Sequence, residues 1–252
     1  MGVLALMYHR TPPAAGHILD VAMPLFRAQI QALQAAGLRF IRFSEALDRR
    51  WYAGDTVIAI TFDDGHASNL EAMAFLHNAG IPFTSFFVRD FVRRGQQGFM
   101  GLEEFKTAYS FGEVGAHGAT HTALTSLGPA SLDEELMASK TYLEEHCGRP
   151  VTTMSAPGGK IDRRVLHAAI KLGFEVLGDS EAMLNTAPRL PLHRICVLKG
   201  QTPEYLLSLA RAGAAYWQYK NLRQTALSKA ARMLGSEKLE ALRRVFKGYE
   251  PR

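Results

Sequence analysis

The sequence predicts an α/β fold: a distorted or incomplete (β/α) barrel of about seven parallel strands with a C-terminal helical tail. Short apolar segments rich in β-branched and aromatic residues alternate with longer segments of helical periodicity over most of the chain. No glycine-rich phosphate-binding loop follows any of the apolar segments, which argues against a nucleotide-binding open sheet. We therefore expect a barrel domain over residues 1–219 and a basic amphipathic helical tail over residues 220–252.

The expected strands are short and apolar. The segment Thr56–Phe62 (TVIAITF) is apolar throughout and rich in β-branched residues, which is typical of a strand buried on both faces of a parallel sheet. The sequence places strands at Val3–Tyr8, Phe40–Phe43, Thr56–Phe62, Phe83–Val88, Phe111–Gly115, around Met154, Phe174–Leu177 and Ile195–Leu198.

Helix boundaries are marked by residues that favour helix ends. Pro24 is expected at the start of a helix and Gly37 just after its end. The pairs Ser68 with Glu71 and Ser131 with Glu134 have the spacing of capping boxes. The long segments Pro12–Met23 and Arg89–Gly101 are expected to be loops that either cover a substrate or only connect elements. The expected helices are Leu25–Ala36, a short one from Ser44, and longer ones from Ser68 to Gly80, from Ser131 to Gly148 and from Asp162 to Gly173.

The composition is that of an ordinary globular protein. Of the 252 residues, 47% are apolar and 21% are charged, which excludes a disordered or collagen-like chain. No apolar run reaches the ~20 residues that span a bilayer, and no basic region precedes the first apolar segment, so we expect no secretory signal. Cys147 and Cys196 lie far apart, which argues against a disulfide framework or a thiolate zinc site. We expect a cytoplasmic protein that could act at the inner membrane face, and an extracytoplasmic location stays open.

The positive charge is concentrated near the C-terminus. The formal net charge is +5, and residues 220–252 contain nine basic and three acidic residues, so the rest of the chain is slightly acidic. Leucines recur in this tail at roughly helical intervals. Helices that close the domain are the simplest interpretation, and peripheral contact with an anionic membrane or an acidic partner is the second. No motif of a nucleic-acid reader is present, so we expect no nucleic-acid partner.

Two motifs that follow expected strands carry side chains suited to catalysis. Asp63 and Asp64 come directly after a buried strand, where barrel enzymes place their reactive groups. Adjacent carboxylates repel each other unless a cation or a shared proton lies nearby. His117 and His121 are four residues apart, so on a helical turn they would share a face and could chelate one metal ion. Taken singly, each motif is also typical of a solvated turn.

Together the two motifs predict a metal site. One Asp and two His form a three-ligand shell with an open position for water, which is the pattern of catalytic rather than structural zinc. The second Asp would then be free to accept a proton from that water. A third segment, Ala156-Pro157-Gly158-Gly159, predicts a tight loop whose backbone can approach a ligand.

In chain order, Thr61-Phe62-Asp63-Asp64-Gly65, the His-x-x-x-His pair and the Pro-Gly-Gly loop resemble the motifs of the polysaccharide deacetylase (NodB-homology) family of carbohydrate esterases. Leu6–His9 and Leu192–Val197 are similar to further family segments, so the resemblance covers most of the chain up to about residue 200. The resemblance implies a distorted barrel, a divalent metal ion that is usually Zn²⁺, and hydrolysis of N-acetyl groups on an acetylated hexosamine-containing carbohydrate.

The resemblance also implies roles for individual residues. Asp63 matches the catalytic base, and His193 falls near a motif in which a histidine is the general acid. It further implies that Asp64, His117 and His121 are metal ligands. From their places in the sequence, we also expect that the substrate site is lined by His9, Pro157, Gly158 and Arg194.

The chain departs from the family pattern at two places. Many members have an Arg two residues before the Pro of the third motif, where it orients the base. This chain has Ser155 at that position, and Arg194 is our candidate for holding Asp63 instead. An Asp with a nearby Trp, common in the family, is not recognisable around Gly178–Ser180. An O-acetyl carbohydrate esterase or a cyclic-amide hydrolase on the same barrel stays open, and a non-catalytic carbohydrate-binding protein is a third alternative.

Overall fold

The computed structural model describes residues 1–213, 215–220 and 222–223. Contacts divide the chain into two units, Met1–Arg211 and Ala212–Arg252. Of the predicted tail, all but Lys220, Leu222 and Arg223 lies outside the described residues. The amphipathic helices of the tail and its membrane contact therefore stay predictions. Among the described residues, no helix is both long and apolar enough to cross a membrane.

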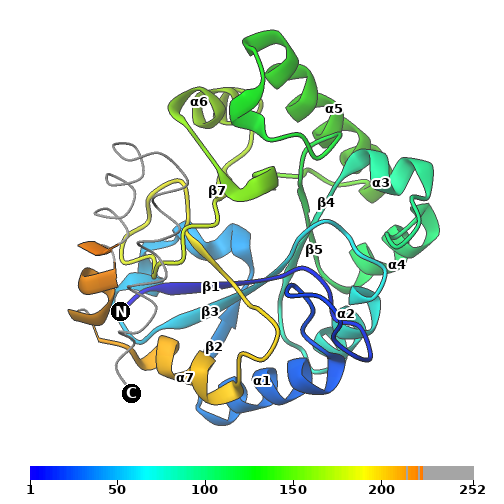
Figure 1. Cartoon of the computed structure of the whole chain (residues 1–252). Coiled ribbons are helices and arrows are strands. Elements are labelled where there is room, and N and C mark those ends of the chain that lie inside the picture. The colour runs from blue at the N-terminus through cyan, green and yellow to red at the C-terminus, as the bar shows by residue number, and fades with distance from the viewer. Residues whose placement is uncertain (214, 221, 224–252) are drawn as a thin grey trace, which may run out of the picture. The chain divides into compact units, whose positions relative to one another are not determined.

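The unit Met1–Arg211 is built on a parallel sheet that nearly closes into a barrel (Figure 1). Seven strands follow the order β7-β6-β5-β4-β3-β1-β8, and a parallel bridge between Gly178 and Leu192 links the end of β7 to the segment before β8. The short β2 pairs with the first half of β3, and β4 pairs with its second half. This arrangement confirms the predicted fold class. The strands are β1 (Val3–Tyr8), β2 (Arg39–Ile41), β3 (Val57–Phe62), β4 (Thr84–Phe87), β5 (Glu113–Ala116), β6 (Thr153–Ser155), β7 (Val176–Gly178) and β8 (Arg194–Cys196).

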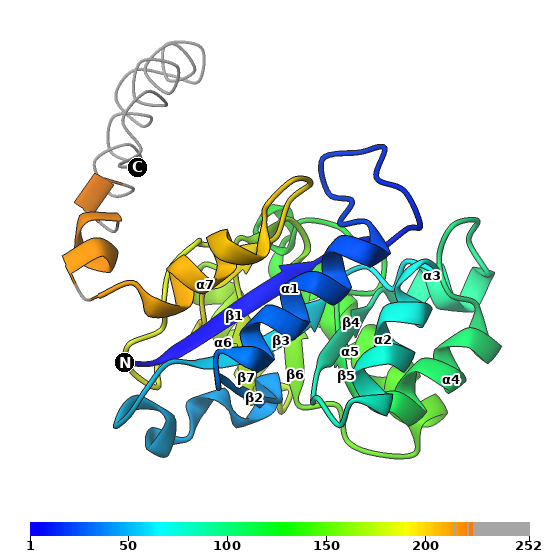
Figure 2. The ribbon, with the colours of Figure 1, turned by 90° about the horizontal axis from the view of Figure 1, so that it is seen from below.

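Helices cover the outside of this sheet. Packed pairs follow one another around it, from α7 and α1 through α2, α4 and α5 to α6 (Figure 2). The helices are α1 (Met23–Ala35), α2 (Asn69–Asn78), α3 (Arg89–Arg94), α4 (Leu102–Phe111), α5 (Pro129–Cys147), α6 (Arg163–Lys171) and α7 (Pro203–Arg211), with 3₁₀ turns η1 (Phe43–Leu47), η2 (Arg49–Tyr52), η3 (Leu124–Ser126) and η4 (Pro157–Gly159).

Both predicted capping boxes are wrong. Ser68 precedes α2, but its hydroxyl accepts a hydrogen bond from the Thr11 backbone N–H and contacts Nδ1 of His66 instead of capping the helix. Helix α5 begins two residues before Ser131, because Pro129 occupies its first position, where the missing N–H of proline costs no hydrogen bond.

The segment Arg89–Gly101, expected to be a loop, contains α3. This short helix ends at Gly95, which adopts a left-handed conformation. The predicted cap at Asp162 is confirmed, since its carboxylate accepts a hydrogen bond from the N–H of Val165 at 2.9 Å.

The barrel interior is apolar over the N-terminal halves of the strands. Side chains two residues apart share a face of a strand, and alternate residues of β1 and β3 pack inward. Phe43 of η1 packs edge-to-face on Phe86 of β4, with 5.6 Å between ring centroids. The buried cluster consists of Val3, Ala5, Ile41, Phe43, Ala46, Trp51, Val57, Ala59, Phe86, Val176 and Leu192. Toward the carboxyl ends of the strands, the buried side chains Thr61 and Ser155 are polar instead, and the guanidinium of Arg194 reaches both of them from the start of β8, so the interior becomes a polar site there.

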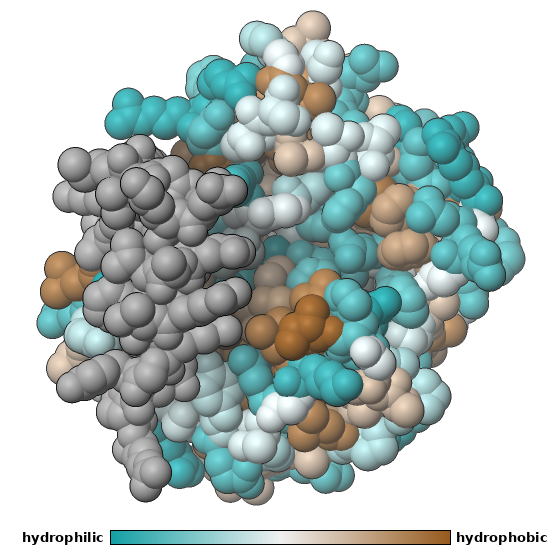
Figure 3. Space-filling view, viewed as in Figure 1, coloured by the Kyte–Doolittle hydropathy of each residue, from teal (hydrophilic) through white to brown (hydrophobic). Residues whose placement is uncertain are grey.

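The described surface carries scattered apolar residues. On the face shown in Figure 3, hydrophobic residues form small separate groups among hydrophilic ones. Single exposed apolar side chains of this kind are normal for a globular protein and mark no docking surface by themselves.

Candidate metal and catalytic site

The candidate residues come from the carboxyl ends of several strands. Asp63 and Asp64 follow β3, His117 follows β5, and Pro157 follows β6. This is the end of a parallel barrel at which loops from separate strands converge. These residues therefore meet at one end of the sheet, although they are far apart in sequence. His193 and Arg194 lie instead at the start of β8, from which the Arg194 guanidinium reaches Asp63.

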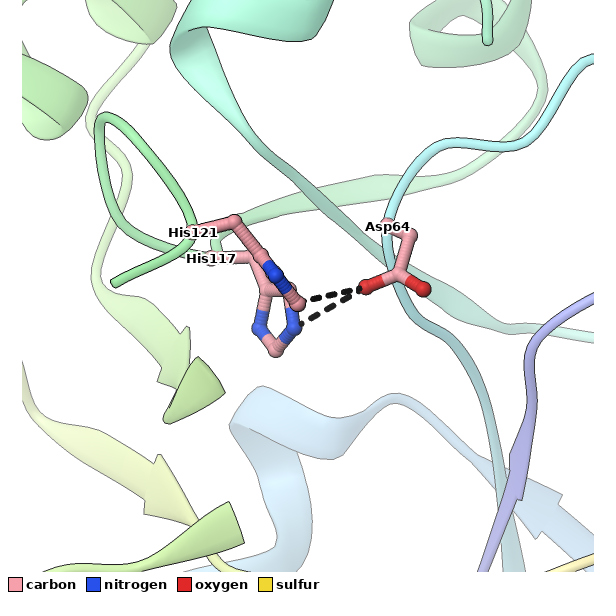
Figure 4. A group of neighbouring side chains, drawn as sticks. All are labelled: Asp64, His117 and His121. Carbon is pink, nitrogen blue, oxygen red and sulfur yellow. Dashed lines mark ion pairs between the residues drawn. The ribbon is translucent and has the colours of Figure 1, made fainter. Parts of the chain in front are cut away.

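Three side chains converge on one point. Nε2 of His117 and Nε2 of His121 each lie 3.2 Å from Oδ1 of Asp64. Figure 4 shows both imidazole rings facing the same carboxylate oxygen. The potential ligand atoms of these residues all lie within 4.8 Å of one another, so the structure brings the three predicted metal ligands together.

The spacing of the two histidines is typical of a helical turn, but the structure shows no helix there. Residues 117–121 form a loop between β5 and η3. Gly118 and His121 have positive φ angles of 76° and 65°, and Asp64 has a φ of 69°. Left-handed conformations are unfavourable for non-glycine residues and require support from the surrounding structure. The convergence of the two rings is therefore a property of the loop and its packing.

The polar groups at this point fit a cation. Nδ1 of His117 lies 2.9 Å from the carbonyl oxygen of Ser155, so it donates a hydrogen bond there and Nε2 is the ring nitrogen whose lone pair can ligate a cation. That lone pair faces Oδ1 of Asp64, which is also an acceptor. This oxygen is buried. It lies 3.2 Å from Nε2 of both imidazoles, but among the described residues none forms a hydrogen bond with it. Acceptor atoms gathered without a donor are the environment that a divalent ion requires.

The pKa of Asp64 is set by the same neighbours. Burial alone would raise it, but the hydrogen bonds that His117 and His121 can donate, and the positive charge that these rings carry when protonated, outweigh burial and hold the pKa far below its usual value. The carboxylate in turn raises the pKa of His121. Asp64 is therefore ionised, as a ligand must be.

Asp63 is held by a buried arginine. Nη1 and Nη2 of Arg194 donate to Oδ1 and Oδ2 of Asp63 at 2.7 and 2.8 Å, and the Ser155 hydroxyl donates to Oδ2 at 3.0 Å. Burial would raise the pKa of Asp63, but the Arg194 charge, with His117, lowers it below its ordinary value. Asp63 is 2% exposed, and its Oδ2 lies 4.0 Å from Nε2 of His117. Asp63 is therefore next to the three candidate ligands, but the oxygen that both imidazoles face belongs to Asp64.

Arg194 contacts Asp63 in the way that the family resemblance expects of an arginine at position 155. Its guanidinium also donates to Oγ of Ser155 at 2.7 Å and its Nε to the carbonyl oxygen of Asp179 at 3.0 Å. Arg194 is 0% exposed, so it positions Asp63 rather than contacting a substrate. Its assignment among the substrate-lining residues is thereby corrected, whereas the expected contact with Asp63 is present.

Asp179 is a site residue that sequence reasoning missed. It directly follows β7, and its Oδ2 lies 2.9 Å from Nδ1 of His193. This hydrogen bond raises the pKa of His193, against the opposing effect of burial. The position of Asp179 after an expected strand was a usable signal. Among the described residues, Asp179, Glu181 and His193 form the other cluster of metal-ligand type, but the hydrogen bond already pairs its imidazole with a carboxylate.

His9 follows β1 and lies near the same carboxylates. Burial lowers its pKa, while the charges of Asp63 and Asp64 act in the opposite direction. Its Nδ1 lies 3.7 Å from Sγ of Cys196. In contrast, the charges that act on His193 are those of Asp179 and Glu181.

The Pro-Gly-Gly loop lies against the histidine loop. Pro157 is buried, and a Cβ atom placed on Gly118 would lie 3.3 Å from its Cγ. Gly158 is exposed and has a φ of 68°. Pro157 thus packs against the ligand loop, whereas Gly158 is open to solvent, and its contact with a substrate stays a prediction.

Comparison with known proteins finds similarity to polysaccharide deacetylases. A family model described as polysaccharide deacetylase matches residues 52–177. YxkH of Bacillus subtilis (strain 168), provisionally named a polysaccharide deacetylase, is 26% identical over 204 residues, which cover 78% of this chain and 72% of YxkH.

Solved structures share the fold. The Streptococcus pyogenes deacetylase PplD, solved in complex with acetate, superposes with a TM-score of 0.76 at 21% identity, over 84% of this chain and 99% of PplD. The polysaccharide deacetylase BC0361 from Bacillus cereus has a TM-score of 0.71 at 25% identity, over 84% of this chain and 69% of BC0361. With the family model covering half of the sequence, these matches lead to one conclusion. The chain belongs to the polysaccharide deacetylase family, hydrolases that remove acetyl groups from carbohydrate polymers.

Proposed function

We propose that this protein is a metal-dependent hydrolase that removes N-acetyl groups from a poly- or oligosaccharide containing N-acetylhexosamine, including a lipid-linked precursor in polysaccharide synthesis. One observation carries the proposal: Asp64, His117 and His121 converge on a single point while an ionised Asp63 lies directly beside them. A non-catalytic carbohydrate-binding protein would have no need of this second, separately held carboxylate.

The ligand set favours Zn²⁺. Two imidazole nitrogens and one carboxylate oxygen are common zinc ligands, and three protein ligands leave a position open for chemistry. A divalent ion bound there would act as a Lewis acid toward the acetamide carbonyl and would lower the pKa of water. The hydrogen bond from Nδ1 of His117 to the Ser155 carbonyl oxygen fixes the ring, so that Nε2 would be the nitrogen that holds such an ion.

The residues of the chain supply the proton transfers. Asp63, kept ionised by Arg194, accepts the proton of the attacking water at a carboxylate oxygen. The departing amine then needs a proton. His9 is coupled electrostatically to both Asp63 and Asp64, and its lowered pKa makes the protonated ring a stronger acid. We propose His9 as the donor, while the sequence resemblance favoured His193.

A matched pair of variants separates the two histidines. We expect His9→Ala to reduce kcat by about 100-fold or more, because the leaving amine loses its acid, and His193→Ala to have the smaller effect. Both variants are measured for kcat and for zinc content. A larger loss of kcat in His193→Ala, with zinc retained, would return the role to His193 and its partner Asp179.

Acetate release tests the proposed reaction. We expect the zinc-loaded protein to release acetate from N-acetylglucosamine oligomers, and a strong chelator to stop the reaction. Asp64→Ala should lose bound metal and turnover together, because it removes a ligand. Release from acetylated xylan alone would identify an O-acetyl esterase. Opening of a cyclic amide without acetate release would identify a cyclic-amide hydrolase, and carbohydrate binding without any turnover would identify a binding protein.

A further inference from the structure

We propose that Glu135 is a positioning residue for the cation site: its buried carboxylate holds the 117–121 loop in the ligating conformation and strengthens cation binding through its charge. The proposal rests on the proposed function, since it concerns the same ion. Glu135 belongs to α5, which the motifs of the sequence did not connect with the site.

Glu135 holds the backbone next to a proposed ligand. Its Oε1 accepts a hydrogen bond from the N–H of Thr120 at 2.7 Å. The Thr120 hydroxyl lies 3.1 and 3.0 Å from the two carboxylate oxygens. Thr120 immediately precedes His121, whose φ of 65° requires support from its surroundings. The carboxylate thus fixes the peptide that carries His121 toward Asp64.

Among the described residues, no cationic side chain forms a salt bridge with Glu135. The side chain is 7% exposed, and its hydrogen bonds come from the neutral amide and hydroxyl of Thr120. Within the part of the chain that the structure describes, no Lys, Arg or His lies within the 4.0 Å of an ion pair with it. A buried carboxylate without a counter-charge is unfavourable. A divalent ion at the neighbouring site would offset that cost, so burial of Glu135 and binding of the ion favour each other.

The loop is shaped to accept this carboxylate. Gly118 has a φ of 76°, and a Cβ atom placed on it would lie 2.9 Å from Oε1 of Glu135. Any side chain at this position would push the carboxylate out of contact with Thr120. The glycine between the two histidines therefore serves the loop conformation and the approach of Glu135 at once.

Zinc affinity measures the proposed role without reference to turnover. Metal-depleted wild-type protein, Glu135→Gln, Glu135→Ala and the control Glu134→Gln are titrated with Zn²⁺ by calorimetry, with folding checked by circular dichroism. The control removes the same charge from the neighbouring, exposed position of α5. We expect Glu135→Gln, which keeps an acceptor but loses the charge, to weaken zinc binding about 10-fold, and Glu135→Ala about 100-fold. Glu134→Gln should bind as wild type does.

The outcomes are separable. The proposal would be overturned if folded Glu135→Gln bound zinc as tightly as wild type and Glu134→Gln do. If Glu135→Ala does not fold, the zinc affinity of Glu135→Gln decides alone. At saturating Zn²⁺, kcat of Glu135→Gln should recover to near the wild-type value, because the ligands and Asp63 are intact. The proposed function fails in a different way: wild type and Asp64→Ala would then bind zinc equally weakly.

Discussion

Asp63→Asn is expected to lower kcat by about three orders of magnitude while leaving zinc bound. The amide has the shape of the carboxylate but cannot accept the proton of the attacking water. The three ligand residues are unchanged, so metal content should persist. The measurements are acetate release under saturating substrate and zinc content of the purified variant.

A matched control is Asp55→Asn. Asp55 is an exposed carboxylate that precedes β3, whereas Asp63 follows the same strand. Turnover in Asp55→Asn should equal that of wild type. Turnover in Asp63→Asn within about 10-fold of wild type would fall short of the contribution of a general base and would remove Asp63 from that role.

Arg194→Met is expected to lower the free energy of unfolding by about 3–5 kcal/mol and to reduce turnover as well. The substitution leaves the Asp63 carboxylate buried without the two hydrogen bonds and the positive charge of the guanidinium. The pKa of Asp63 should then rise, because burial is no longer opposed, and less of the ionised base is available. Urea-induced unfolding and kcat are the two measurements.

The double variant Arg194→Met with Asp63→Asn is the control for this interpretation. It removes the stranded charge along with its partner, so its free energy of unfolding should exceed that of Arg194→Met alone. Equal free energies for the single and the double variant would show that lost packing, rather than an unpaired carboxylate, accounts for the destabilisation.

The parts of the fold that were predicted depend on local sequence patterns. Continuous apolar segments such as Val57–Phe62 identify buried parallel strands, and the Asp and His motifs lie where those strands end. Helix α4 also had a local signal that was overlooked, since the backbone N–H of Gly101 donates to Glu104 at 3.0 Å in the manner of a helix start. Helix α3 is short and largely polar, so it lacks the apolar periodicity that marks a helix.

The parts of the site that were not predicted depend on contacts between distant residues. Arg194 and Asp63 are 131 positions apart, and only the closing of the barrel places them in contact. The histidine loop was expected to be helical, because residue spacing carries no information on the φ angles of Gly118 and His121. Glu135 has the appearance of an ordinary helix surface residue until the packing of α5 places it beside Thr120.

The most direct test is the position of zinc in crystals of the wild-type protein, located by anomalous diffraction at the zinc absorption edge. We expect one ion at ~2.0–2.2 Å from a carboxylate oxygen of Asp64 and from Nε2 of His117 and His121. The Asp63 carboxylate should remain paired with Arg194, outside the ligand shell. Zinc bound at Asp179, Glu181 and His193 instead, with Asp64 apart from the two imidazoles, would contradict the proposed catalytic site.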